Sequence, residues 1–268
     1  MAKCEILDSG LVIQETNRGV SLLTLDRAQV SNAIDPDLAS ALGRYFAELS
    51  TRTEIRVVVL QGRGRNFCAG FDLNHVNEIT SNVSESQRLQ RLMSEIVLRM
   101  RRCPQPIIAL VQGAASGAGF ALALAADVRL ATPDARMNVA MARIGLTGCD
   151  MGISYFLPRL VGPSIAAELM MTGRFIDAAR AERLGLLSGI VELANLQTRG
   201  QSLAEEMLAL SPSGLRLTKE GLNSALTAGS LEEVVALEDR GQVICIHQHM
   251  KEGVAAFREK RPPNYVAG

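Results

Sequence analysis

Short apolar runs alternate with amphipathic stretches through the first half of the chain. Residues 57–60 and 107–111 are continuously apolar, as expected of strands buried on both faces of a sheet. A helix is predicted between them, because apolar side chains recur three and four positions apart at Leu89, Leu92, Met93, Ile96, Val97 and Met100. Residues 18–25 resemble another strand, and Asp35 followed by Pro36 predicts another helix start. This alternation indicates an α/β fold with parallel strand pairing.

From Pro163 onward the pattern becomes nearly all helical, and no internal repeat or Pro/Ser-rich linker divides the chain. We therefore predict a core covering residues 1–195 and a helical C-terminal region covering residues 196–268. Two helix starts are also predicted. One is a capping box at Ser84 and Gln87, and the other is a helix over residues 151–160 that Asp150 would cap.

Composition narrows the classes of protein to consider. The 268 residues are 47% hydrophobic and 21% charged, which excludes intrinsic disorder. Lys+Arg and Asp+Glu both number 28, so the chain lacks the basic excess that nucleic-acid binders use against phosphates. The five cysteines are scattered without CxxC spacing, which argues against a disulfide framework or a zinc site. We expect no bound metal and no nucleic-acid partner, and a reducing cytoplasmic location fits best.

Residues 107–126 imitate a membrane span, since only Gln112 and Ser116 are polar. Three glycines break this run, however, so a buried strand, a glycine turn and a buried helix fit better. The first residues contain neither a long apolar segment nor an Arg/Ser-rich leader. We therefore expect no membrane partner.

Two glycine turns follow the two buried strands, at residues 66–73 (NFCAGFDL) and 113–120 (GAASGAGF). Ligands bind at the carboxyl ends of parallel strands, and the second turn opens a helix whose first N–H groups lack intrahelical partners. The two turns could aim two N–H donors at one oxyanion, or their small residues could simply allow close helix–sheet packing. Leu122 at the third glycine position excludes a dinucleotide fingerprint, and no P-loop sequence occurs.

These turns, with LPR at residues 157–159, TGR at 172–174 and AFREKR at 256–261, resemble the motifs of the crotonase (enoyl-CoA hydratase/isomerase) superfamily. The resemblance covers essentially the whole chain. It implies a spiral of ββα units with a helical C-terminal trimerisation region, assembled as a homotrimer or a hexamer. It also implies an acyl-CoA thioester as substrate, and no cofactor beyond the coenzyme A that the substrate carries.

The resemblance also assigns roles to residues. The family's two oxyanion donors are backbone amides, and they correspond here to Phe71 and Ala118, where relatives usually have glycine at the second position. The same turns supply further positions expected to bind substrate or CoA, with a structural role as the alternative for Asp72: Ala69, Gly70, Asp72, Leu73 and Gly117. Phe257 and Lys260 match a contact to the CoA nucleotide that is often made across a subunit boundary; a solvated basic end is the alternative.

Enoyl-CoA hydratases typically use two glutamates, and this sequence has Ala121 and Met141 at those positions. Asp150 matches an aspartate that moves a proton in dienoyl-CoA isomerases and is the nucleophile in 4-chlorobenzoyl-CoA dehalogenase. The segment between Gly145 and Asp150 is one residue longer here than in those relatives. A single base suits isomerisation of an enoyl- or dienoyl-CoA through an enolate better than addition of water. The alternatives are an aspartate-nucleophile hydrolase or dehalogenase, and a CoA-binding homologue without activity.

Overall fold

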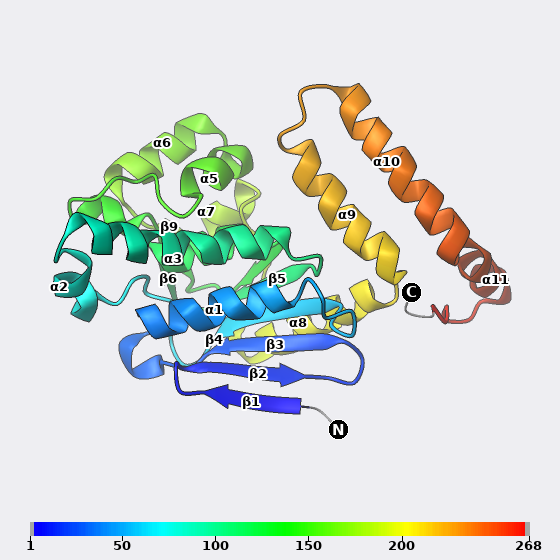
Figure 1. The fold of residues 1–268 in the computed structure, drawn as a ribbon, viewed down its shortest axis with the longest axis horizontal. Coiled ribbons are helices and arrows are strands. Elements are labelled where there is room, and N and C mark those ends of the chain that lie inside the picture. The colour runs from blue at the N-terminus through cyan, green and yellow to red at the C-terminus, as the bar shows by residue number, and fades with distance from the viewer. Residues whose placement is uncertain (1–2, 266–268) are drawn as a thin grey trace.

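The computed structural model describes residues 3–265 and contains a seven-stranded sheet with a three-stranded sheet beside it (Figure 1). The strand orders are β1-β2-β3-β4-β5-β7-β10 and β6-β8-β9. The strands are β1 (Lys3–Leu7), β2 (Leu11–Glu15), β3 (Val20–Leu25), β4 (Val57–Gly62), β5 (Ile107–Val111), β6 (Ala114–Ser116), β7 (Val128–Ala131), β8 (Arg136–Asn138), β9 (Ile176–Asp177) and β10 (Gly189–Ile190).

Helices fill the connections between these strands. They are α1 (Pro36–Glu48), α2 (Val76–Ile79), α3 (Val83–Arg102), α4 (Ala118–Ala125), α5 (Ile153–Val161), α6 (Pro163–Thr172), α7 (Ala178–Arg183), α8 (Leu193–Leu208), α9 (Pro212–Ala225), α10 (Leu231–Cys245) and α11 (Lys251–Glu259). Short 3₁₀ segments are η1 (Ala28–Val30), η2 (Leu73–His75) and η3 (Ala140–Arg143), and η4 (Ile246–Met250) is a π segment.

The predicted parallel pairing is confirmed in the centre of the large sheet. The pairs β3–β4, β4–β5 and β5–β7 are parallel, whereas β1 and β2 add antiparallel strands that the sequence pattern did not predict. After β5 the chain visits both sheets in turn, because β5, β7 and β10 join the large sheet while β6, β8 and β9 form the small one. This alternation is the expected spiral of strand pairs and helices.

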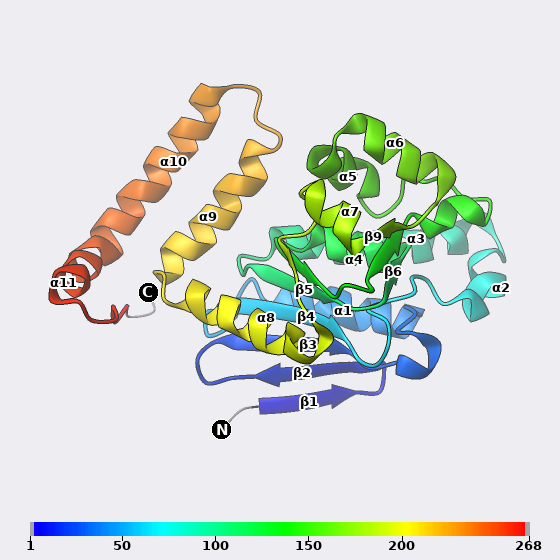
Figure 2. The same ribbon diagram turned by 180° about the vertical axis from the view of Figure 1, so that it is seen from behind.

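The central strands of the large sheet are buried on both faces, whereas the edge strand β1 is largely exposed. Side chains alternate along β4, so that Val58 and Leu60 join the core beneath α1 and α3, while Val57 and Val59 pack with Leu196 of α8 on the other face. Figures 1 and 2 show these helix layers from opposite sides, with α1 and α3 in front in the first view and α8 in front in the second. Burial on both faces explains why the central strands contain no alternating polar positions.

Two helix starts test the predicted caps. The Asp35 carboxylate accepts a hydrogen bond from the Leu38 amide at 2.8 Å at the start of α1, as predicted. The predicted capping box at Ser84 is wrong, because α3 begins at Val83 and the Asn82 side chain caps it by accepting from Glu85 N at 2.9 Å. Asparagine is as good a cap as serine, so the earlier residue defines the helix start.

The C-terminal helices α9, α10 and α11 extend away from the sheets in both views (Figures 1 and 2). The boundary predicted between residues 195 and 196 falls inside α8, whose Leu196 and Ala204 pack against the large sheet. Leu215 of α9 belongs to the same cluster, so the predicted boundary divides helices that pack on the sheet. Among the described residues, no helix is long and apolar enough to cross a membrane.

Candidate active site

Backbone hydrogen bonds join the two glycine turns side by side. Cys68 N donates to Ala114 O at 3.1 Å, and Ser116 N donates to Cys68 O at 2.9 Å, which pairs Cys68 with Ala115 in a parallel bridge. The paired residues are 47 positions apart (115 − 68), and the same offset separates Phe71 from Ala118 (118 − 71). The pairing therefore brings the two predicted oxyanion donors to matching positions on neighbouring segments.

Gly70 makes this close approach possible. Its φ is +102°, and a Cβ built on it would lie 2.7 Å from Ser116 O and 3.4 Å from Ala118 N. Any side chain at this position would push the first turn away from the second, and the left-handed φ is itself unfavourable for other residues. The glycine is thus required where the two turns meet.

Among the described residues, the Phe71 and Ala118 amides donate no hydrogen bond, whereas the amides of neighbouring residues do. In the first turn, Ala69 N donates to Ser31 O and Asp72 N donates to Ile34 O, both at 2.9 Å. In the second, Gly117 N donates to Asn138 O at 3.0 Å. Within residues 3–265, neither Phe71 N nor Ala118 N has an acceptor. Because Ala118 is the first residue of α4, the helix dipole adds positive potential at this point. Two free donors at matching positions can stabilise one oxyanion.

An ion-pair cluster includes Asp72 of the first turn. The Arg27 guanidinium contacts the Asp72 carboxylate at 3.1 Å and the Asp35 carboxylate at 2.9 Å, and Asp72 Oδ1 accepts from Asn74 N at 3.1 Å. Burial raises the pKa of Asp72, but the Asn74 amide and Arg27 together outweigh it and hold the pKa below its usual value. Asp72 is 4% exposed and fully engaged, so it supports the turn rather than facing a substrate. Its membership in the predicted substrate-binding set stays a prediction, and these contacts favour the structural alternative.

The same cluster contains three ligand-type groups. Oxygen or nitrogen atoms of Asp35, Asp72 and His75 lie within 4.8 Å of one another. The Arg27 guanidinium already contacts both carboxylates, so a cation there would have to displace a fixed positive charge. These residues do not form a cation site.

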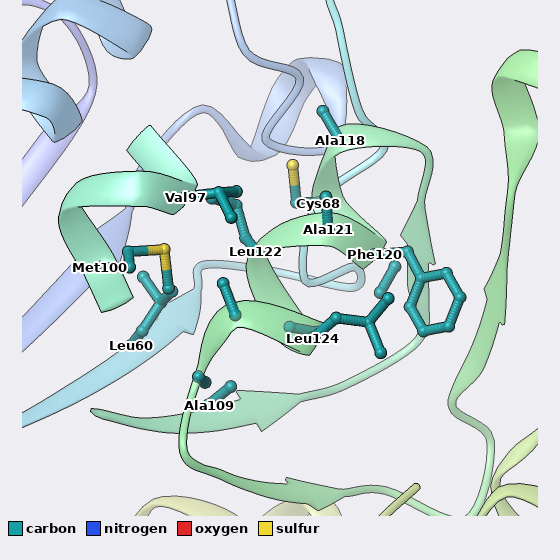
Figure 3. Packing of buried hydrophobic residues seen from close by; sticks show 14 of the residues in the cluster. Leu60, Cys68, Val97, Met100, Ala109, Ala118, Phe120, Ala121, Leu122 and Leu124 are labelled. Atoms are coloured by element: carbon teal, nitrogen blue, oxygen red, sulfur yellow. The ribbon is translucent and has the colours of Figure 1, made fainter. Parts of the chain in front are cut away.

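The positions of the usual glutamates hold side chains without ionisable groups. Ala121 is completely buried in α4, and Figure 3 displays it with Ala118 and Cys68 in the packed core. Met141 of η3 is 6% exposed, and its Cε lies 3.9 Å from the point that a Cβ on Gly117 would occupy. Hydrocarbon and thioether groups therefore line the region where those two carboxylates would stand.

Asp150 lies in the connection between η3 and α5 and is partly exposed. The alternative role as a helix cap is wrong, because α5 begins at Ile153 with Gly152 as the preceding residue, and the Asp150 side chain caps no amide there. Instead, Asp150 Oδ1 accepts a hydrogen bond from Gln90 Nε2 on α3. The carboxylate is thus tied to a neighbouring helix, and its second oxygen has no partner among the described residues.

A cavity of about 530 Å³ begins next to this contact, between α3, α5 and the end of α9. Its walls are mainly apolar and are formed by Ser94, Val97, Leu98, Arg101, Arg102, Met151, Gly152, Tyr155, Phe156, Asn223 and Leu226. Ser94 follows Gln90 by one helical turn, and Met151 follows Asp150 directly, so two lining residues lie close in the chain to the Gln90–Asp150 pair.

The remaining predicted residues fall into two groups. Ala69 and Leu73 are exposed beside the first turn, where Leu73 is 58% exposed. Phe257, which is 85% exposed, and Lys260 belong to the end of α11, at the opposite end of the molecule from the turns (Figure 1). One chain therefore does not bring Phe257 and Lys260 to Phe71 and Ala118.

Sequence reasoning missed two residues that shape the site. Gln90 is one of several polar residues on the exposed side of α3, and nothing in its local sequence distinguishes it. Asn32 is completely buried, and its Nδ2 donates to Arg63 O, Asn66 O and Phe67 O at the start of the first turn. Its place before Asp35 in a polar loop gave only a weak sign of this role.

Comparisons with known proteins identify the family of the chain. A family model described as enoyl-CoA hydratase/isomerase matches residues 15–267. A Mycobacterium bovis protein named probable enoyl-CoA hydratase is 37% identical over 264 residues, covering 96% of this chain and 92% of its own length. A 1,2-epoxyphenylacetyl-CoA isomerase of Escherichia coli is 31% identical over 258 residues, covering 95% and 98%.

The solved structure of an enoyl-CoA hydratase from Bacillus anthracis aligns with a TM-score of 0.91 at 28% identity, covering 97% of this chain and 100% of that one. The relatives' names differ in the reaction, but each names a CoA derivative. Since the family match, the sequence identity and the fold all extend over nearly the whole chain, this protein belongs to the enoyl-CoA hydratase/isomerase, or crotonase, family.

Proposed function

We propose that this protein is a cytoplasmic enzyme that isomerises an enoyl- or dienoyl-CoA thioester through an enolate. The observation that carries the proposal is the pair of free amides, Phe71 N and Ala118 N, at matching positions of the two joined turns. A thioester oxygen docked between them would gain negative charge as the enolate forms. Removing one such donor typically costs about 10²–10³ in rate, so the pair would supply several kcal/mol.

The set of ionisable groups favours isomerisation over hydration. Adding water needs one group to activate the water and another to deliver a proton, and neither Ala121 nor Met141 can do so. Asp150 alone can remove the α-proton from a 3-enoyl thioester, which moves the electron pair into the thioester oxygen between the two amides. Return of the same proton to the γ-carbon shifts the double bond, and the Asp150 carboxylate is regenerated unprotonated. Protons and electrons balance without water or a cofactor.

The cavity beside Asp150 suits the acyl tail of such a substrate. Its lining along α3 runs from Ser94 to Arg102, a length of about 12 Å at the helical rise of 1.5 Å per residue. Each buried methylene stabilises binding by about 0.8 kcal/mol, or roughly fourfold. We therefore expect kcat/KM to rise with acyl length beyond four carbons, and Ser94→Phe to reduce that rise while sparing a four-carbon substrate.

Neighbouring subunits would complete the CoA site. Apolar side chains stay exposed along the C-terminal helices, among them Leu222, Leu231, Val243, Ile246 and Phe257. Exposed apolar side chains of this kind favour burial against further copies, as in a homotrimer or a hexamer. In that assembly Phe257 and Lys260 would contact the CoA nucleotide of an adjacent subunit.

A panel of CoA thioesters tests the proposal. Wild-type protein and Asp150→Asn are incubated with 3-enoyl-, 2,4-dienoyl-, 2-enoyl- and aryl-CoA substrates, followed by ultraviolet absorbance and mass spectrometry. Isomerisation leaves the mass unchanged and should fall by about 10²–10⁴ in Asp150→Asn. Efficient addition of water by both proteins would contradict the proposal. A covalent adduct on Asp150 would identify it as a nucleophile, and absence of turnover with retained CoA binding would identify an inactive homologue.

A further inference from the structure

Asn32 lies in the connection between β3 and α1, and both ends of its side-chain amide are hydrogen-bonded to backbone. Its Oδ1 accepts from Arg27 N at 2.9 Å. Its Nδ2 donates to Arg63 O at 2.9 Å, Asn66 O at 2.8 Å and Phe67 O at 3.2 Å. The residue is completely buried, so this one amide satisfies backbone carbonyls inside the protein.

Two of these carbonyls belong to peptide groups whose N–H also bonds to the start of the second turn. The carbonyl oxygens of Asn66 and Phe67 accept from Asn32. The N–H groups of the same two peptides donate to Gln112 O at 2.8 Å and to Ala114 O at 3.1 Å. The C=O and N–H of a trans peptide point in opposite directions. The side chain therefore pairs with the first turn on the side opposite the second turn, as a further strand would.

The backbone of the same connection continues this pairing up to Phe71. Ser31 O accepts from Ala69 N at 2.9 Å, and Ile34 N donates to Gly70 O at 2.7 Å. Ile34 also pairs with Phe71 in a parallel bridge. The position of the Phe71 amide is therefore set by the connection between β3 and α1.

Asparagine suits this place for two reasons. Its φ is +56°, in the left-handed region that asparagine adopts more readily than most side chains. The amide also needs room at the end of β4, where Gly62 has no side chain. A Cβ built on Gly62 would lie 2.8 Å from Asn32 Nδ2 and 2.7 Å from Asn66 O. The glycine therefore leaves the space that the Asn32 amide occupies.

We propose that Asn32 is a positioning residue for the oxyanion site, which holds the first turn against the second so that the Phe71 and Ala118 amides stay aligned. The catalytic consequence rests on the proposed function, whereas the scaffold role of Asn32 does not. Without the Nδ2 donor, buried carbonyls lose a partner and the first turn is free to shift. A displacement of 1 Å can cost about 10²-fold in rate, so a partial shift is enough to weaken the site.

Asn32→Asp tests the proposal, with Gln105→Glu as its matched control. Each change replaces a buried amide NH₂ group with oxygen at nearly the same volume. Gln105 is 5% exposed, and its Nε2 donates to the carbonyls of three residues outside the glycine turns: Leu49, Arg52 and Ile55. Both variants should lose stability toward urea to a similar extent, since each leaves buried carbonyls unpaired.

Hydrogen exchange followed by mass spectrometry tests the scaffold role without a substrate. Asn32→Asp should speed exchange in residues 66–72 by about tenfold, whereas Gln105→Glu should speed it only in residues 49–56. Asn32→Gly is a second variant that should match Asn32→Asp, because glycine keeps the left-handed φ without strain but lacks the amide. Exchange of residues 66–72 that is unchanged in both Asn32 variants, or equally fast in Gln105→Glu, would overturn the scaffold role.

The ultraviolet signal of the enolate of bound acetoacetyl-CoA tests the positioning role. It should fall by about three- to tenfold in Asn32→Asp and Asn32→Gly and stay at the wild-type level in Gln105→Glu. If the Asn32 variants keep the wild-type signal while residues 66–72 exchange faster, the positioning role is wrong and the proposed function stands. If wild type gives no signal but the contrast in exchange holds, the proposed oxyanion site is wrong and the scaffold role stands.

Discussion

Gly70→Ala is the sharpest test of the joined turns. The new Cβ would lie 2.7 Å from Ser116 O, whereas ordinary contacts begin at about 3.4 Å, so the turns must separate by about 0.7 Å (3.4 − 2.7). A misplacement of 1 Å can cost about 10²-fold in rate, so we expect a loss of about ten- to a hundredfold. The φ of +102° adds strain, and we expect the free energy of unfolding to fall by about 3 kcal/mol in total.

Enolate formation provides an assay that does not require the natural substrate. Acetoacetyl-CoA bound between two amides should shift toward its enolate, which is followed by ultraviolet absorbance, and Gly70→Ala should weaken that signal. Gly185→Ala is the control, because Gly185 has a φ of +78° but no atom closer than 4.0 Å to an added Cβ. It should lose about 1–2 kcal/mol of stability and leave the enolate signal unchanged. If Gly70→Ala also leaves the signal unchanged, the reasoning from the aligned amides is refuted.

Three further predictions concern the supporting structure. Lys219 of α9 is 4% exposed, and its Nζ contacts Asp127 at 3.0 Å, Met100 O at 3.0 Å and Gln105 O at 2.8 Å. Lys219→Met should lower the free energy of unfolding in urea by about 3 kcal/mol, whereas the exposed Lys251→Met should change it by less than about 0.5 kcal/mol; equal effects would argue against this anchor. Because the pKa of Asp72 is lowered in the folded protein, its contribution to stability is complete above the unfolded pKa of about 3.9 and is lost as pH falls through the lower folded pKa. Asp72→Asn should therefore flatten the fall of unfolding free energy in acid, and an unchanged slope would contradict the ion pair with Arg27. Burial raises the pKa of the Cys68 thiol to about 12, so a thiol reagent at pH 8 should label the exposed Cys4 and Cys149 but reach Cys68 only after denaturation, and native labelling of Cys68 at the rate of Cys149 would disprove its burial.

Local sequence patterns predicted the elements whose apolar residues lie close together in the chain. The central strands of the large sheet were found as short, continuously apolar runs, and the apolar side of α3 was found because its side chains repeat at the period of a helix. The antiparallel strands β1 and β2 were missed because such strands are short and recognisable mainly by their partners. The start of α3 was misplaced by a few residues because two good caps, Asn82 and Ser84, stand close together.

By itself, the sequence determined that two glycine turns follow two parallel strands. It also determined that the two usual glutamate positions hold Ala121 and Met141, and that Asp150 follows Met141 by nine positions. Tertiary structure alone decided that the turns pair with an offset of 47 residues, which aligns the Phe71 and Ala118 amides. It also decided that Asp72 forms an ion pair with Arg27 and that Gln90 donates a hydrogen bond to Asp150. The physical reason is the separation along the chain. Periodicity and capping depend on residues a few positions apart, whereas each of these contacts joins groups 45 to 60 positions apart. Such groups come together only in the packed fold.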